Sequence, residues 1–277
     1  MKGTPPNNLL RESQAFLQRY AAERLKQRKA SHAEASRRAE RLRKLLFSGV
    51  SKDDPRLTKL KEQSMAAMQK RKQRKVVRPK LTPAKIKAPA DAQFVLSVPP
   101  YDATWTNMSK QGDIAQADAS TGSCGLQVYS FGDDDHEAFA AVGVRYYSTA
   151  DNPMLHFTAT VDYSDSWFNV ADYYVGHNDM RTSLLVWGSK EGGLFLQSDF
   201  SPNWSDGASW LDDHENSDQG RSWINTYIPV QFDGQYLVWV TFDASVYADH
   251  GFWGGAWSGI SFGCTVPFMT FGNLFGS

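Results

Sequence analysis

The tetrapeptide Asp-Asp-His-Glu occurs twice in this chain, at residues 134–137 and at residues 212–215. Carboxylates clustered with an imidazole bind divalent cations, calcium through oxygen ligands and zinc when a histidine takes part. The spacing lacks the alternation of an EF-hand loop, so an acidic surface loop is the alternative interpretation. The hypothesis is a divalent-cation site, with calcium favoured over zinc, formed by Asp134, Asp135, His136, Glu137, Asp212, Asp213, His214 and Glu215.

A group of tryptophans in polar, glycine-containing segments forms the second candidate site. An indole ring offers an apolar face to a sugar, and neighbouring Asp and Asn side chains can bind the hydroxyl groups. The alternative is that these tryptophans belong to the core. The pattern predicts a carbohydrate or another surface ligand at Trp204, Trp210, Trp223, Trp253 and Trp257.

The chain contains no recognisable catalytic motif. Ser123 and Ser258 lack the G-x-S-x-G pattern of a nucleophile, and no glycine-rich phosphate loop precedes a helix. Paired carboxylates could hydrolyse a glycosidic bond, but a segment with 23 acidic residues contains many such pairs by chance. Cys124 and Cys264 are too few for a zinc knuckle and indicate buried free thiols, or a disulfide in an oxidising compartment. A non-enzymatic protein is therefore preferred over a carboxylate-dependent hydrolase.

The charges of the chain are strongly segregated along the sequence. Residues 1–90 carry 25 basic and 7 acidic side chains, whereas the rest carries 5 basic and 23 acidic ones, so a net charge of zero conceals two opposite halves. Such a basic segment indicates an anionic partner, either nucleic acid or an acidic protein surface. The predicted contact residues are Arg37, Arg38, Arg41, Arg43, Lys44, Lys70, Arg71, Lys72, Arg74, Lys75, Arg78 and Lys80.

The basic segment has the composition of helices. Residues 9–47 contain no Pro or Gly, and Asp53-Asp54-Pro55 is a helix start signal. We expect a basic helical arm over residues 1–78, with helices at about 8–47 and 55–75, and a Pro/Lys-rich linker at 79–92. Two alternatives remain: a solvated helical hairpin, or a helix lying on the acidic domain of its own or a neighbouring chain.

Residues 93–277 read as an acidic, aromatic-rich β domain. Short runs of Val, Tyr, Phe, Trp and Thr alternate with turn residues, which predicts a jelly-roll-like all-β sandwich of about eight or more antiparallel strands. In residues 155–163 apolar and polar positions alternate, so one face should be buried. Residues 236–242 are apolar on both faces, so that strand should be covered on both sides.

Two local patterns in this domain carry specific predictions. Asp233-Gly234 between apolar runs is typical of a tight hairpin turn with positive φ, so residues 227–232 and 235–242 are expected to pair. Residues 205–220 read as a long polar connection, and residues 167–174 as at most one helical turn. The remaining predicted strands are 94–98, 126–131, 139–148, 184–187, 193–197 and 260–269.

A basic helical arm, a linker and a β-sandwich are together similar in architecture to coat proteins of small icosahedral viruses. The first hypothesis is therefore a polyanion-binding assembly protein that forms homo-oligomers. The second is a glycan- or surface-ligand-recognition module carried on a helical docking segment. No signal peptide or membrane-spanning stretch is apparent, so we expect a soluble protein made in the cytoplasm, with assembly into a particle or export without a cleaved signal as its two further routes.

Overall fold

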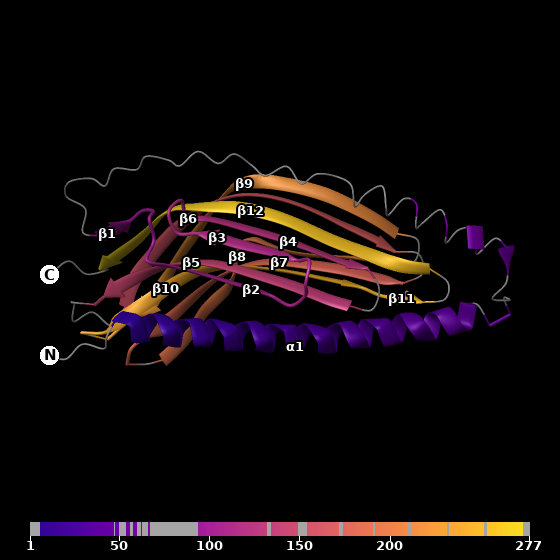
Figure 1. Cartoon of the computed structure of the whole chain (residues 1–277), viewed down its shortest axis with the longest axis horizontal. Helices are drawn as coiled ribbons and strands as arrows, with labels where there is room; N and C mark the ends of the chain where they lie inside the picture. The colour runs from indigo at the N-terminus through magenta and orange to yellow at the C-terminus, as the bar shows by residue number, and fades with distance from the viewer. Residues whose placement is uncertain are drawn as a thin grey trace.

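The computed structural model of the chain is a β-sandwich with a long helix, α1 (Pro6–Leu46), against one of its faces (Figure 1). It describes residues 6–46, 48–49, 54–55, 58–59, 62, 66, 94–131, 134–148, 154–171, 174–190, 192–209, 212–231, 233–251 and 254–273. The expected second helix and the linker lie almost entirely outside these residues.

Within the described residues, the strands form two antiparallel sheets. One sheet has seven strands in the order β3-β4-β12-β6-β9, with β1 and β11 also paired to β12; the other has the order β2-β5-β10-β7-β8. This confirms the predicted jelly-roll-like sandwich. The strands are β1 (Phe94–Ser97), β2 (Ala103–Met108), β3 (Ile114–Asp118), β4 (Ser123–Phe131), β5 (Asp134–Tyr147), β6 (Met154–Ala171), β7 (Val175–Gly188), β8 (Gly192–Ser209), β9 (Asp212–Pro229), β10 (Gln235–Ala248), β11 (His250–Gly251) and β12 (Gly254–Asn273).

The main core lies between the two sheets. On β6 the odd positions Leu155, Phe157, Ala159 and Val161 are buried there, as the alternation predicted. Cys124 and Cys264 are register partners on β4 and β12. Both are buried free thiols. None of the described helices is long and apolar enough to cross a membrane.

Most of the polar segment 205–220 is not a connection. Residues 205–209 belong to β8, which pairs with β7, and residues 212–220 belong to β9, which pairs with β6. β6 likewise continues through residues 167–171, where one helical turn had been the most we expected. β9 is an edge strand that pairs with β6 alone, and residues 215–221 are exposed whichever way they point. This exposure removes the apolar alternation by which a strand is recognised, which explains the wrong prediction.

The predicted hairpin around Asp233 is also wrong, although the turn itself exists. Asp233 has a φ of 58°, the positive value that the Asp-Gly pair indicated. However, β9 pairs with β6, whereas β10 pairs with β5 and β7 in the other sheet. The turn therefore carries the chain from one sheet to the other, and the two apolar strands do not pair with each other.

Strand β10 is buried on both faces, as its sequence predicted. Tyr236, Val238, Val240 and Phe242 point into the core between the sheets. On the other face Leu237 and Trp239 belong to a second apolar cluster, which α1 completes with Leu9 and Leu17. The five-stranded sheet is thus covered by the other sheet on one side and by α1 on the other (Figure 1).

Helix α1 is straight in the view of Figure 1 and runs along most of the length of the sandwich. Its 41 residues correspond to about 60 Å of helix. Its buried positions are four or seven residues apart, that is, one or two helical turns, and they change from apolar to polar along the helix. Leu9, Leu17 and Ala21 are apolar, whereas Arg28 and His32 occupy the same inner stripe further on, each 7 % exposed.

Candidate functional site

The polar half of α1 lies over a row of carboxylates on the five-stranded sheet. Glu137 of β5 and Asp179 of β7 both lie opposite Ser245 of β10, and Asp243 lies two residues away on the same face of β10. All three carboxylates are almost completely buried. They lie on the face that β5, β7 and β10 turn toward α1, so the helix is placed to supply counter-charge to them.

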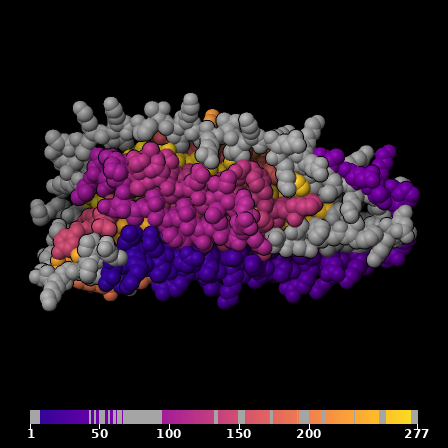
Figure 2. All heavy atoms as spheres, in the orientation of Figure 1, coloured from indigo at the N-terminus to yellow at the C-terminus, as the bar shows by residue number. Residues whose placement is uncertain are grey.

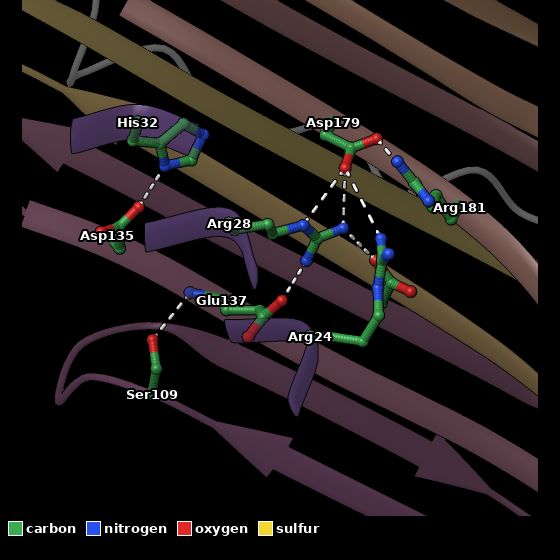
Figure 3. Close-up of polar contacts among 9 residues, drawn as sticks. Arg24, Arg28, His32, Ser109, Asp135, Glu137, Asp179 and Arg181 are labelled. Atoms are coloured by element: carbon green, nitrogen blue, oxygen red, sulfur yellow. Dashed lines mark hydrogen bonds and ion pairs between the residues drawn. The ribbon is translucent and has the colours of Figure 1, made fainter. Parts of the chain in front are cut away.

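Arg28 supplies most of that charge (Figure 3). Its Nη2 donates to Asp179 Oδ2 at 2.8 Å and to Asp243 Oδ1 at 2.5 Å, and its Nη1 donates to Glu137 Oε1. Arg181 Nε donates to Asp179 Oδ1 at 3.2 Å, and Arg24 Nη2 lies 3.9 Å from Asp179 Oδ2. We call Arg24, Arg28, Glu137, Asp179, Arg181 and Asp243 the Arg28 cluster.

Burial and neighbouring charges shift the pKa values of the cluster members in different directions. Burial opposes ionisation of Arg28, but Asp243, Glu137 and Asp179 outweigh it and raise the pKa of the guanidinium. Burial also raises the pKa of Glu137 to about 7, although the charge of Arg28 opposes the shift. Asp179 keeps a lowered pKa, because Arg28 and Arg181 outweigh its burial. Glu137 therefore holds a proton at mildly acidic pH.

Stability should consequently fall as the pH rises from about 4.5 to about 7. Over this window an unfolded Glu137 loses its proton while the folded one retains it, so the folded state binds more protons. The loss is of the order of 3 kcal/mol. Replacing Glu137 by Gln should remove this part of the pH dependence in urea unfolding measured at a series of pH values. An E137Q variant that keeps the wild-type slope would contradict the assignment.

The C-terminal half of α1 continues the polar contact with the sheet. His32 Nδ1 pairs with Asp135 Oδ1, and the His32 ring stacks on Tyr247 with centroids 4.6 Å apart. Ser36 Oγ lies 2.5 Å from the hydroxyl of Tyr247. The basic helix thus lies on the acidic β domain, the arrangement that the sequence left open as one alternative. The contact between α1 and the sheet is therefore a docking interface within the molecule, in which the helix covers the charged groups of the sheet.

The first Asp-Asp-His-Glu motif is divided between the two faces of β5. Asp135 and Glu137 point toward α1, whereas His136 points the other way and its Nδ1 lies 2.9 Å from Asp113 Oδ1. The side chain of Asp134 lies outside the described residues. A strand alternates its side chains, so four consecutive residues cannot converge on one ion.

The second motif lies on β9, where His214 joins two carboxylates. Its Nδ1 lies 3.1 Å from Asp206 Oδ1 and its Nε2 lies 3.0 Å from Asp212 Oδ2, so hydrogen bonds engage both ring nitrogens. Asp213 and Glu215 alternate with these residues and are exposed. Among the described residues, no three His, Cys, Asp or Glu side chains are arranged to hold a metal ion. Cation binding by either motif stays a prediction.

The five candidate tryptophans do not share one environment. Trp204 is half-buried, stacks on Trp167 with centroids 4.1 Å apart, and donates from Nε1 to Asp165 Oδ2 at 2.8 Å. Trp257 is buried against Phe131. Trp210 and Trp253 lie outside the described residues. Trp223 is 61 % exposed, more than any other described tryptophan.

Trp223 lies on the outer face of the seven-stranded sheet, away from α1. Ile224 and Ile228 of β9 point into the core, so Arg221, Trp223, Asn225 and Tyr227 point outward. Tyr227 is 46 % exposed. Opposite them on β6 lie Asp162, Thr160, Thr158 and His156, in that order. We call the set Arg221, Trp223, Asn225, Tyr227, His156, Thr158 and Asp162 the β9 platform.

Hydrogen bonds and ring contacts order the β9 platform. Arg221 donates to both oxygens of Asp162, at 2.5 and 2.8 Å. His156 Nε2 lies 2.7 Å from Asn225 Oδ1, and the His156 ring packs against Tyr227 at 5.2 Å. Trp223 meets Phe268 of β12 edge to face, with centroids 6.0 Å apart. The aromatic rings are thus supported from the neighbouring strands while their outer surfaces stay exposed.

Sequence reasoning identified Trp223 but missed its neighbours on the platform. The sequence did contain evidence for them. Ile224 and Ile228 alternate with Trp223, Asn225 and Tyr227, so in a strand with its isoleucines buried the other three side chains point outward. It also missed Arg28 and His32 as docking residues. Their signal was their position, since both continue the spacing of the inner stripe begun by Leu17 and Ala21.

The residues predicted to bind a polyanion lie on the outside of α1 or beyond the described residues. Arg37, Arg38, Arg41 and Lys44 are exposed, and the helix forms a continuous band along the lower side of the molecule in Figure 2. Arg38 pairs with Glu34, and Lys44 Nζ lies 2.7 Å from Glu40. The side chain of Arg43 and the residues Lys70, Arg71, Lys72, Arg74, Lys75, Arg78 and Lys80 are not among those described.

The chain matches no known protein family and no curated protein in sequence. Its solved structural neighbours include a carbohydrate-binding module, TmCBM61, in complex with β-1,4-galactotriose (12 % identity, TM-score 0.21, 62 % of this chain and 90 % of that one). Another is the enzymatically active domain of tailspike protein 4 of bacteriophage CBA120 (10 % identity, TM-score 0.21, 65 % of this chain and 19 % of that one). A third is a structure of infectious bursal disease virus Gx strain (11 % identity, TM-score 0.20, 62 % of this chain and 36 % of that one). TM-scores this low support no inference about function.

Proposed function

We propose that this protein is a non-enzymatic recognition protein that binds carbohydrate on the β9 platform. The observation that carries the proposal is the 61 % exposure of Trp223 on a regular sheet face, with Tyr227 exposed four residues further along the same strand. Single exposed apolar side chains are ordinary, but two aromatic rings among Asn, Thr and a paired Arg offer both the stacking surface and the hydrogen bonds that a sugar requires.

Replacing Trp223 by Ala should weaken glycan binding by about 2 kcal/mol, roughly a thirtyfold loss of affinity. The side chain is mostly exposed, so the variant should unfold at nearly the wild-type denaturant concentration. The measurement is a glycan array followed by titration calorimetry on the best ligand. Tyr147, an aromatic residue of the other sheet that is 49 % exposed, provides the matched control as Tyr147→Ala. Equal losses in both variants, or an array without any binding, would contradict the proposal.

Polyanion binding through the outer face of α1 is the second candidate function. The observation that favours it is the exposure of Arg37, Arg41 and Lys44 while Arg28 and His32 of the same helix face the sheet. Docking therefore uses one side of the helix and leaves a basic side available for phosphate contacts. In this arrangement a polyanion would bind to a helix already held on the sandwich, which suits assembly of several copies around one polymer.

Binding of single-stranded DNA or heparin should then weaken steeply as salt rises, because each phosphate contact releases counterions. The double variant Arg37→Gln/Arg41→Gln should reduce the slope of log affinity against log salt by about 1 to 2. Arg145→Gln/Lys190→Gln removes the same charge from the sandwich and should leave the slope unchanged. Binding that does not respond to salt would eliminate this candidate.

A further inference from the structure

We infer that the ligand of the β9 platform is a neutral oligosaccharide that lies along β9 and contacts Trp223 and Tyr227 at the same time. This inference rests on the proposed carbohydrate-binding function and specifies the ligand class of the same site. It follows from three properties of the platform: its charge, the separation of its aromatic rings, and the groups between those rings.

The charge of the platform is internally balanced. Asp162 accepts one hydrogen bond from Arg221 at each carboxylate oxygen, a bidentate arrangement that pairs the two charges. The guanidinium is therefore already matched, and a sulfate or uronate would have to compete with Asp162 for it. His156 Nε2 is engaged by Asn225 Oδ1. A ligand without charge avoids the cost of breaking the Arg221 pair, and this favours a neutral sugar over an acidic one.

The two exposed rings set the length of the ligand. Trp223 and Tyr227 are four residues apart on one strand, which places them about 13 Å apart along β9. A monosaccharide can stack on one ring but cannot reach the other. An extended chain of several rings can cover both, and simultaneous contact raises affinity because the second contact is intramolecular.

The groups between the two rings are polar and uncharged. Asn225 lies midway on β9, and Thr158 faces it on β6. The hydroxyl of Thr158 lies 2.5 Å from that of Thr270 on β12, so a short row of hydroxyl and amide groups crosses the platform between the aromatic ends. Along the platform an apolar surface is followed by a polar one and then by a second apolar one. This order matches an oligosaccharide whose end rings stack on Trp223 and Tyr227 and whose hydroxyl groups lie between them. It does not fit a continuous apolar chain.

The test is titration calorimetry of the full chain with two series of saccharides. One series contains neutral gluco-, galacto-, manno- and xylo-oligosaccharides from the monosaccharide to the hexasaccharide; the other contains heparin and hyaluronan oligosaccharides. Each is measured at low and high salt and at pH 8, where an ordinary imidazole is neutral. We expect a neutral series whose affinity rises about tenfold or more with length, levels off once both rings are covered, and does not change with salt.

The variants separate this inference from the proposed function. In Tyr227→Ala the longer oligosaccharides should bind no better than the short ones, while Trp223→Ala should weaken every length. Tyr147→Ala should leave the length dependence intact. Binding of anionic saccharides alone that is lost in Trp223→Ala, or equal affinity for monosaccharide and hexasaccharide, would overturn the inference but keep carbohydrate binding on the platform. A panel without binding of any saccharide would overturn both.

Discussion

Replacing Arg28 by Met should lower the free energy of unfolding by about 3–5 kcal/mol. Arg28 is the common partner of Glu137, Asp179 and Asp243, and all three stay buried when it is removed. Met fills much of the same space without the charge, so the loss comes from the uncompensated carboxylates and not from a cavity. Urea unfolding followed by tryptophan fluorescence and circular dichroism measures the change.

The neighbouring residue provides the control for this prediction. Lys29 is exposed on the same helix, and Lys29→Met should change stability by no more than about 0.5 kcal/mol. Adding Glu137→Gln, Asp179→Asn and Asp243→Asn to the Arg28→Met variant should recover part of the loss, because no buried charge is then left unpaired. Equal stability of the Arg28→Met and Lys29→Met variants would show that the helix does not dock through this cluster.

Replacing Leu17 by Ala should cost about 2–5 kcal/mol at the apolar end of the same interface. Leu17 is completely buried and belongs to a cluster with Leu185, Leu237 and Trp239. If α1 leaves the sheet before the sandwich unfolds, the cost appears as faster hydrogen exchange in α1 and β10 and as increased binding of an apolar dye. Hydrogen exchange followed by mass spectrometry distinguishes this local opening from global unfolding.

Gln18 is the matched control because it follows Leu17 directly and is exposed. Gln18→Ala should leave both stability and exchange close to the wild type, within about 0.5 kcal/mol. Fast exchange throughout α1 in the wild-type protein would contradict the docking of the helix. We expect the backbone amides of α1 around residue 17 and those of β10 to be protected from hydrogen exchange in the wild type, and to lose this protection together in the Leu17→Ala variant.

These two predictions concern the role of α1, for which composition alone indicated a polyanion-binding arm. Its inner stripe is apolar at Leu9 and Leu17 and ionic at Arg28 and His32, and both parts meet matching surface on one sheet. Part of the positive charge of the helix is therefore used inside the molecule. The outer positions Arg37 and Arg41 remain for a partner.

The candidate glycan site shows a different limit of sequence reasoning. The sequence around a tryptophan in a polar segment does not show whether its side chain is buried or exposed. The five candidates include a buried one, Trp257, and an exposed one, Trp223. The partners that support the exposed rings come from other strands. His156 and Phe268 are distant from Tyr227 and Trp223 in sequence and meet them only through the pairing of β6 with β9 and β12.

The sequence by itself determined some of the elements of this protein and which of their faces are buried. Helical composition located α1, alternation located the buried face of β6, and the two apolar faces of residues 236–242 required a covering element on each side of β10. Asp233-Gly234 specified a turn with positive φ. These properties depend on residues near one another in the chain, where spacing determines which side chains share a face.

Only the tertiary structure decided which elements meet. It placed β9 and β10 in different sheets, placed residues 205–209 and 212–220 in strands of different sheets, and joined Arg28 to carboxylates 109, 151 and 215 positions away. The physical reason is that periodicity defines the two faces of a strand but not its neighbours. A buried ion cluster adds a further requirement, since its charges are tolerated only when the fold brings all of its members together.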